Sequence, residues 1–356
     1  MRQVSRNPPM TTYIQAKCHC GLNSFKLAFK TSELPLSTAA CHCNSCRHTT
    51  GQMLVIDVPI QGVPLSSTAE GDVAASLEGL TAYNSSKDMT RYFCTKCSAY
   101  FFFHNGIHDV WAVFSGVLEK VDEVLNVSHH IWVEDTLDGG IADHYRTVND
   151  VVLPRYAQRA TSETLPLGWK AKELATKADT ETHPLHCHCK AISLALTRAT
   201  EIKDPQEYWL VPGKEDGAPI RFIAAHCFCS DCRLSSGSQI QSWVIVPRVN
   251  VIDASTSASV DPETTATRPK GLKQYESSPG KFREFCGTCG ATVFWWREGI
   301  SHFDLSAGLV DQEAGGARAK KWLSWYDRII HPKDAISPAT LAALTEGVKA
   351  AKAEEV

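Results

Sequence analysis

The sequence predicts a mainly β protein built from two small domains of antiparallel sheets, followed by a C-terminal helix. Three observations carry this prediction. The same cysteine pattern occurs twice, most apolar segments are short and rich in β-branched or aromatic residues, and the C-terminal residues have a helical pattern. With 356 residues, the chain is long enough for two domains of ordinary size.

All fourteen cysteines belong to one repeated pattern. Each copy runs C-x-C, C-x-C-x-x-C and C-x-x-C, and its middle element continues with Arg, three residues and Gly: "CHCNSCRHTTG" at 41–51 and "CFCSDCRLSSG" at 227–237. Disulfide frameworks are typical of short secreted chains, whereas gaps of one or two residues suit thiolates that share a metal. Zn²⁺ is the metal expected in a reducing compartment.

The repeat sets the expected domain boundaries: a disordered leader at 1–12, a first domain at 13–150, a linker at 151–182, a second domain at 183–335 and the C-terminal helix at 336–356. The N-terminal segment lacks the apolar core of a secretory signal, a transit peptide is the weaker alternative to a disordered leader, and Met10 is a second candidate start. The second copy carries an extra segment at 204–222, which we expect to be a loop that can cover a site.

Seven segments are expected to be strands because they are short, apolar and bounded by turn residues: 24–30, 52–60, 100–104, 109–119, 192–198, 242–249 and 292–298. We expect the aromatic runs among them to be core strands rather than platforms for nucleic-acid bases. The linker should hold a helical turn or two around Lys170–Lys177. Ser337 as N-cap and Pro338 at the first helical position mark the start of the final helix.

The first and last cysteine pairs of each copy predict a closed metal site. Residues two apart on a strand point to the same side, so C-x-C offers two thiolates to one ion, and a C-x-x-C turn offers two more. Four thiolates leave no position for a substrate, which makes the expected zinc structural. The two predicted sites are Cys18, Cys20, Cys94, Cys97 and Cys187, Cys189, Cys286, Cys289.

The remaining three cysteines of each copy predict an open metal site: Cys41, Cys43, Cys46 and Cys227, Cys229, Cys232. Three protein ligands with a vacant fourth position are the ligand count of a catalytic zinc. Three thiolates make such an ion a weak activator of water and favour the binding of a further thiolate. Two alternatives stay open: the cluster pins a loop, with a fourth ligand from His42, His48, His226 or water, or it holds no metal.

The order C-x-C, C-x-C-x-x-C-R-x-x-x-G, C-x-x-C resembles the family of glutathione-dependent formaldehyde-activating enzymes, which also includes centromere protein V. The resemblance implies a β-tent fold in both halves, with the four-cysteine zinc structural and the three-cysteine zinc at the active site. It also implies that glutathione binds at that zinc and condenses with formaldehyde to S-hydroxymethylglutathione.

The two copies depart differently from the family pattern. The family usually has Gly after the last C-x-x-C, and the second copy keeps it as Gly290 where the first has Ser98. The first copy keeps "HHIWVEDTLDG" at 129–139, which resembles the family's C-terminal signature, whereas the second has "WLSWYDRIIHP". On this signature, we expect the first-copy cluster with Arg47 to be the working centre.

Five residues beside the three-cysteine clusters are candidate catalytic residues: Arg47, Arg233, His42, His48 and Asp231. The two arginines follow the third cysteine and could hold a carboxylate of glutathione or of another anionic substrate, or form a salt bridge or donate to a cysteine sulfur. The histidines, with His226, and Asp231 could move a proton. Surface or hydrogen-bonding roles are the alternative for them.

The sequence therefore predicts a cytoplasmic zinc enzyme of carbon–sulfur lyase type, acting with glutathione or a related thiol as co-substrate on a formaldehyde-like electrophile or a biosynthetic intermediate. The rival hypothesis is a non-catalytic binding or scaffold module; a metal buffer is disfavoured because buffering needs no fixed spacing. A net charge of −3 without basic runs argues against a nucleic-acid partner, and no apolar stretch approaches the roughly 20 residues that span a bilayer. The sequence leaves an oligomer open.

Overall fold

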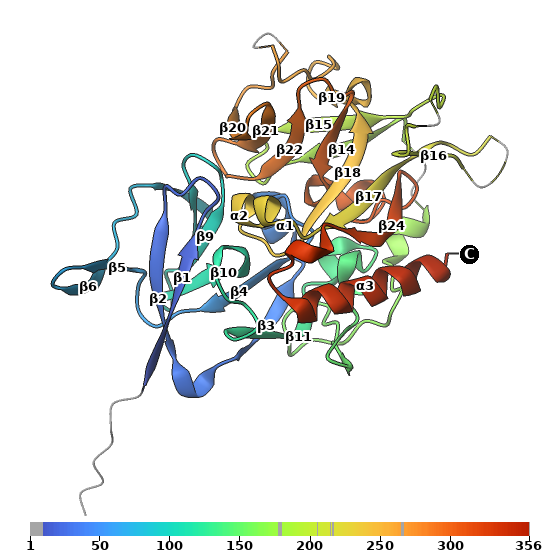
Figure 1. Cartoon of the computed structure of the whole chain (residues 1–356). Coiled ribbons are helices and arrows are strands. Elements are labelled where there is room, and N and C mark those ends of the chain that lie inside the picture. Colours follow the sequence, from blue (N-terminus) through green and yellow to red (C-terminus); the bar gives the residue numbers. More distant parts are fainter. Residues whose placement is uncertain are drawn as a thin grey trace, which may run out of the picture.

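The computed structural model describes residues 10–176, 180–204, 206–213, 215, 217–264 and 267–355. Strand β1 begins at Thr11, inside the segment expected to be a leader, and residues 1–9 of that segment lie outside the described ranges. The architecture is mainly β, with the C-terminal helix in place, which confirms the predicted fold class (Figure 1).

Among the described residues of the first half, the strands alternate with turns and short 3₁₀ helices, and one α-helix interrupts them. Its elements are β1 (Thr11–Lys17), β2 (Ser24–Lys30), β3 (Leu36–Cys41), α1 (Asn44–Thr50), β4 (Val55–Pro59), β5 (Leu65–Thr68), β6 (Gly71–Ala74), β7 (Leu80–Ser86), β8 (Met89–Cys94), β9 (Tyr100–Asn105), β10 (Val110–Phe114), β11 (Leu125–Ile131), β12 (Thr147–Val148) and β13 (Val151–Val152).

The second half repeats this order and ends in the long helix. Its elements are β14 (Thr182–His186), β15 (Ser193–Thr197), β16 (Leu210–Val211), β17 (Arg221–Cys227), α2 (Ser230–Ser236), β18 (Gln241–Pro247), β19 (Val251–Asp253), β20 (Leu272–Ser278), β21 (Lys281–Cys286), β22 (Thr292–Arg297), β23 (His302–Ser306), β24 (Leu323–Ile330) and α3 (Pro338–Ala353). Each of the seven expected strand segments contains a strand.

The large sheets of the two halves have the same topology. The first runs β11-β3-β4-β10-β9-β8-β7, and the second runs β16-β17-β18-β23-β22-β21-β20, with β24 paired to β17. Apart from the additional strand β16, the two orders correspond. In each, one pair is parallel, β3 with β11 and β17 with β24, although we expected antiparallel sheets. Both parallel pairs shift register by a bulge, between Val127 and His129 and between Ala224 and His226. The two halves are therefore copies in structure as well as in sequence.

The two halves interlock through the short helices α1 and α2. Gly51 ends α1 in the left-handed conformation, at φ 77°, and its carbonyl accepts a hydrogen bond from Gly308 of the second half at 3.1 Å. Gly237 ends α2 at φ 79° and accepts from Gly116 of the first half at 3.0 Å. One continuous hydrophobic core contains buried residues of both halves. The repeated glycine of the motif thus serves both the helix end and the contact between halves.

We expect Gly51→Ala to destabilise the fold strongly. An added Cβ would lie 2.2 Å from the Thr292 carbonyl oxygen, in addition to the cost of about 1–2 kcal/mol for a left-handed L-residue. Gly62→Ala is the matched control, because Gly62 has φ 67° but nothing within 4 Å of the added Cβ. Thermal melts of the two variants should therefore differ by several degrees or more; equal melting temperatures would contradict the close contact.

The segment expected to be a linker is packed along the first half. His130 donates from its backbone N–H to Pro154 at 2.8 Å and accepts from Tyr156 at 3.0 Å, so the chain after β13 follows β11. The expected helical turn is a 3₁₀ helix at Lys172–Thr176; Lys177 lies outside the described residues. The boundaries of the two domains stay a prediction.

The C-terminal helix starts as its sequence indicates. The Ser337 hydroxyl accepts from the Thr340 N–H at 3.1 Å, and Pro338 occupies the first turn. Helix α3 packs against β24 and β12, so it touches both halves (Figure 1). Within the described ranges, none of the helices has the length and hydropathy needed to span a bilayer.

Candidate metal centres

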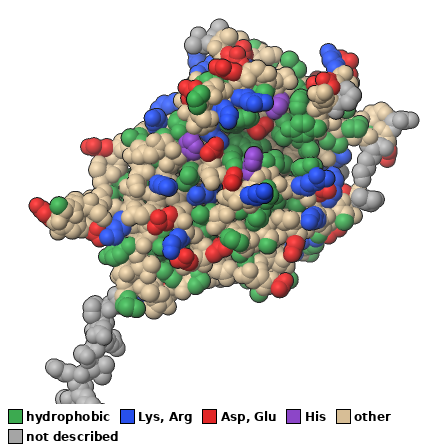
Figure 2. Space-filling model, viewed as in Figure 1, with side chains coloured by type: hydrophobic (Ala, Val, Ile, Leu, Met, Phe, Trp, Pro, Cys, Tyr) green, Lys and Arg blue, Asp and Glu red, His purple; other side chains and the backbone are tan. Residues whose placement is uncertain are grey.

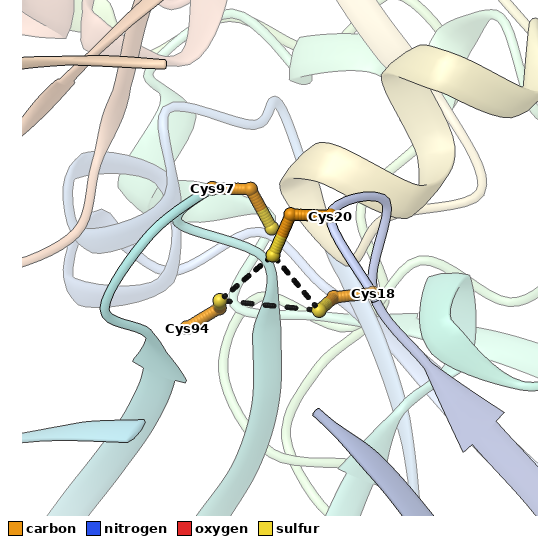
Figure 3. Close-up of side chains that lie close together, drawn as sticks. All are labelled: Cys18, Cys20, Cys94 and Cys97. Atoms are coloured by element: carbon orange, nitrogen blue, oxygen red, sulfur yellow. Dashed lines mark hydrogen bonds between the residues drawn. The ribbon is translucent and has the colours of Figure 1, made fainter. Parts of the chain in front are cut away.

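Both four-cysteine groups are brought together as their spacing predicted. Figure 3 shows the first of them. The Sγ of Cys18 lies 3.5 Å from that of Cys20 and 3.9 Å from that of Cys94, and Cys189 lies 3.5 Å from both Cys187 and Cys286. Four thiolates at 2.3 Å from one tetrahedral zinc would be spaced by about 3.8 Å. The geometry therefore fits zinc, and all fourteen cysteines are free of disulfides.

The three-cysteine groups are also assembled, each at the start of a short helix. Cys43 and Cys229 are the N-caps of α1 and α2, and their sulfurs accept hydrogen bonds from the N–H groups of Cys46 and Cys232 at 3.3 and 3.2 Å. The three sulfurs of each group lie within 4.8 Å of one another. A strand end followed by a helical turn thus aims three thiols at one point, which fits three ligands of a metal ion.

An arginine that the sequence reasoning missed contacts each three-cysteine cluster. Arg91 of β8 donates to the Cys46 Sγ at 3.4 Å, and both terminal nitrogens of Arg283 of β21 lie 3.7 Å from the Cys232 Sγ. Both arginines are buried. Hydrogen bonds from the two neighbouring thiols, and then the guanidinium charge, hold the pKa of Cys46 and that of Cys232 well below the usual thiol range. Each cluster therefore has a built-in counter-charge for a thiolate.

The two candidate arginines of the motif point away from the clusters instead. Arg47 is fully buried and donates to the side chain of Gln312 at 2.6 Å. Arg233 donates to the carbonyl oxygens of Gly116 and Leu118 at 2.6 and 3.2 Å. These three partners belong to the other half, and Arg47 also donates to the Asn44 side chain of its own helix at 3.1 Å. The structure places both arginines in the contact between the halves, and their role toward a substrate stays a prediction.

The histidines beside the cysteines also point away from the clusters. His42 hydrogen-bonds His130 at 2.9 Å, and His226 hydrogen-bonds His144 at 3.1 Å and the Ser242 hydroxyl at 2.9 Å. Burial lowers the pKa of His226 to about 3 and that of His42 well below its usual value. Both rings are therefore buried, neutral and hydrogen-bonded within the protein.

His48 and Asp231 lie at the contact between the halves as well. His48 stacks on His186 with ring centroids 4.2 Å apart, and burial lowers its pKa to about 3. Asp231 is largely exposed, and its Oδ1 lies 3.3 Å from Nε2 of His19, the residue between Cys18 and Cys20. The other nitrogen of His19 hydrogen-bonds the Tyr275 hydroxyl at 2.7 Å. The closed site of one half therefore touches the open cluster of the other.

A half-buried carboxyl group lies near each open cluster. Asp57 of β4 belongs to the first and Asp304 of β23 to the second. Burial, and then the charge of the nearby Cys46 or Cys232, raises the pKa of each carboxyl to about 7, while Arg91 or Arg283 opposes the shift. Each can hold or release a proton near neutral pH. Single carboxylates inside strands carried no signal in the sequence.

A cavity of about 370 Å³ opens directly on the second cluster. The three cysteines line it together with Trp243, Arg283, Trp295, Asp304 and His331. The face shown in Figure 2 is hollowed near α2 and the start of β18, which are labelled in the same view in Figure 1. Lys and Arg are interspersed with Asp and Glu on this face. Of the candidate catalytic residues, Asp231 lines this cavity.

The second half does contain a counterpart of the segment 129–139. The backbone N–H of His42 donates to Ile131, and that of Phe228 donates to Ile330, each at 3.0 Å. The next residues, Trp132 and His331, both have a left-handed backbone, at φ 58° and 52°. The two halves therefore differ in the sequence of this segment but share its backbone conformation. His331 lines the second cavity.

We expect Arg283→Met to weaken zinc binding at the second cluster by about 10–100-fold, because outer-shell partners of metal ligands typically contribute this much. Arg91→Met is the matched control, since it changes only the first cluster. Alkylation of the cysteines during a chelator challenge, followed by mass spectrometry, reports which cluster releases its metal. Equal protection of Cys232 in the native chain and in Arg283→Met would contradict the role of Arg283.

The comparisons with known proteins agree with the cysteine geometry. A family model described as glutathione-dependent formaldehyde-activating enzyme matches residues 13–135 and 214–326. The first match contains all seven cysteines of its copy, and the second starts after Cys187 and Cys189. Neither a curated protein nor a solved structure matches the chain. Because the two matched regions together cover more than half of the sequence, the chain belongs to the family of glutathione-dependent formaldehyde-activating enzymes.

Proposed function

We propose that the protein is a zinc-dependent enzyme of carbon–sulfur lyase type, which joins glutathione or a related thiol to an electrophilic small molecule. The observation that carries the proposal is the second three-cysteine cluster, which is backed by Arg283 and opens on a cavity. Family membership supports glutathione and an aldehyde as reactants. We also propose a cytoplasmic location, because free thiolates at these spacings require a reducing compartment.

The residues of the second cavity suit an addition of a thiol to a carbonyl group. A zinc ion held by three thiolates would supply an open coordination position that lowers the pKa of an incoming thiol. Arg283 keeps the cluster charge balanced, and the cavity walls orient the electrophile. The thiol sulfur forms the new C–S bond, and the π electron pair of the carbonyl moves to its oxygen. That oxygen takes up the proton that the thiol has released.

Asp304 is placed to carry that proton. It lines the same cavity as the three cysteines, and its pKa near 7 allows it to accept the thiol proton and return it to the carbonyl oxygen. The reverse sequence of the same transfers would cleave the C–S bond, which is the lyase direction. His42, His48 and His226 take no part in this scheme, because they are buried and hydrogen-bonded to other residues of the protein.

Cobalt substitution tests the proposal on the full chain. Reduced glutathione should add a saturable thiolate-to-cobalt absorption band, because a further sulfur joins the open site, whereas oxidised glutathione should add none. Formaldehyde supplied with reduced glutathione should then give S-hydroxymethylglutathione by mass spectrometry faster than without protein. An unchanged spectrum with reduced glutathione would overturn the proposal and favour a non-catalytic zinc-stabilised scaffold.

A further inference from the structure

Next to each cluster, the large sheets of the two halves carry the same two residues. Tyr83 lies directly opposite Arg91 on β7 and β8, and Tyr275 lies opposite Arg283 on β20 and β21. Both arginines contact the third cysteine of their cluster. This part of the sheet face is the same in both halves, and each tyrosine hydroxyl hydrogen-bonds a histidine of the other half, His188 or His19, at 2.7 Å.

Farther along the same row of the sheet, the two halves diverge. In the second half, Trp295 lies opposite Arg283, and Asp304 lies opposite Trp295. In the first half, Phe103 and Ala112 occupy these two positions. Residues that face each other across neighbouring strands lie on one face, so this row of the second half adds a larger aromatic ring and a carboxyl group. The carboxyl group near the first cluster, Asp57, comes from β4 instead.

A second tryptophan marks the same difference. Cys227 pairs with Gln241 as Cys41 pairs with Val55, so Trp243 of the second half corresponds to Asp57 of the first. Trp243 packs with Cys227 and Cys232 in a small apolar cluster separate from the main core, and Trp295 lies against it. The second cluster therefore has two indole rings at its open side.

The extra segment of the second half extends this aromatic surface. A cavity of about 750 Å³ adjoins the first and shares Trp295, Asp304 and His331 with it, and Tyr208 and Trp209 of the extra segment form its other wall. Tyr208 is 62% exposed, and its ring meets that of Trp209 edge-on at 5.1 Å. The two cavities form one trough that leads from the cysteines to the extra segment.

We propose that this trough binds a flat, ring-containing electrophile, with the ring against Trp295 and Trp243 and the reacting carbon at the second cysteine cluster. This inference rests on the proposed thiol addition and names the class of its second reactant. Cavities of roughly 300–1,000 Å³ accept molecules of several rings, whereas a one-carbon aldehyde would leave the indoles without a partner. The second cluster, rather than the first, is then the centre that handles this reactant.

Binding of an unreactive aromatic ketone tests the trough without the thiol chemistry. The zinc-loaded full chain should bind 2-acetonaphthone saturably in calorimetry, and Trp295→Ala should weaken this binding about tenfold, the value of a stacked ring pair. Phe103→Ala, the matching change in the first half, should leave it within about twofold. Trp295→Phe keeps a ring and should lose less than Trp295→Ala, which guards against a folding artefact.

Turnover separates this inference from the proposed function. With reduced glutathione, Trp295→Ala should lower kcat/KM for 2-naphthaldehyde about tenfold more than it lowers kcat/KM for formaldehyde, because only the aromatic aldehyde has a ring to lose its partner. No saturable binding of 2-acetonaphthone, or equal losses in Trp295→Ala and Phe103→Ala, would overturn the trough as the ring site. Saturable binding without thiol adduct formation from either aldehyde would instead overturn the proposed thiol addition and leave the aromatic site standing.

Discussion

Cys289→Ser is expected to unfold the whole chain rather than one half of it. A structural zinc contributes folding free energy outright, about 10–16 kcal/mol in zinc-finger peptides, and an ordinary domain has only about 5–15 kcal/mol to lose. The loss of folding free energy should reach the first half as well, because the C-x-x-C turn of the second half packs against it. The Tyr100 hydroxyl donates to the Cys289 carbonyl, and a Cβ at Gly290 would lie 2.5 Å from the Phe93 ring.

Cys229→Ser is the matched control for that variant. It removes one thiolate from an open cluster at a helix N-cap, where serine is itself a favoured cap residue. We expect its melting temperature to stay within a few degrees of the native value, with zinc retained in both closed sites. Circular dichroism melts and zinc analysis check both variants. Equal melting losses would contradict the division into closed and open sites.

The second large effect concerns activity. Replacing Cys227, Cys229 and Cys232 together by serine should abolish thiol-dependent turnover of an aromatic aldehyde, a loss greater than the 10–100-fold typical of outer-shell changes. The matched triple variant of Cys41, Cys43 and Cys46 should keep most of that activity. Turnover of 2-naphthaldehyde with reduced glutathione measures both. If the first-cluster variant is inactive while the second-cluster variant is active, the catalytic centre is the first cluster, as the sequence alone suggested.

That difference between sequence and structure has a physical cause. The segment 129–139 resembles a family signature in sequence, but its backbone path recurs at Ile330 and His331 with different side chains. Sequence similarity could not reveal a shared left-handed residue that is Trp132 in one half and His331 in the other. Nor could it show that Trp243 and Trp295, far apart along the chain, meet at one cluster.

The cysteine clusters themselves were predictable, because their spacing alone fixes which thiols can converge on a strand or a turn. The arginines were predictable in principle, since Arg91 and Arg283 each lie three residues before a C-x-x-C. The roles of Arg47 and Arg233 were not, because their partners come from the other half of the chain. Helices α1 and α2 were also missed, since each has seven residues and a cysteine as its N-cap.

Native mass spectrometry of the full chain tests the central claim most directly: each half holds one closed and one open zinc site, and the second open site binds a thiol. The native chain should carry four zinc ions, one for each cysteine cluster, and should gain glutathione when the reduced tripeptide is added. The triple serine variant of the second cluster should carry three zinc ions and gain none at that site. A native chain with disulfides and no zinc, or with only two zinc ions and no bound glutathione, would contradict the account.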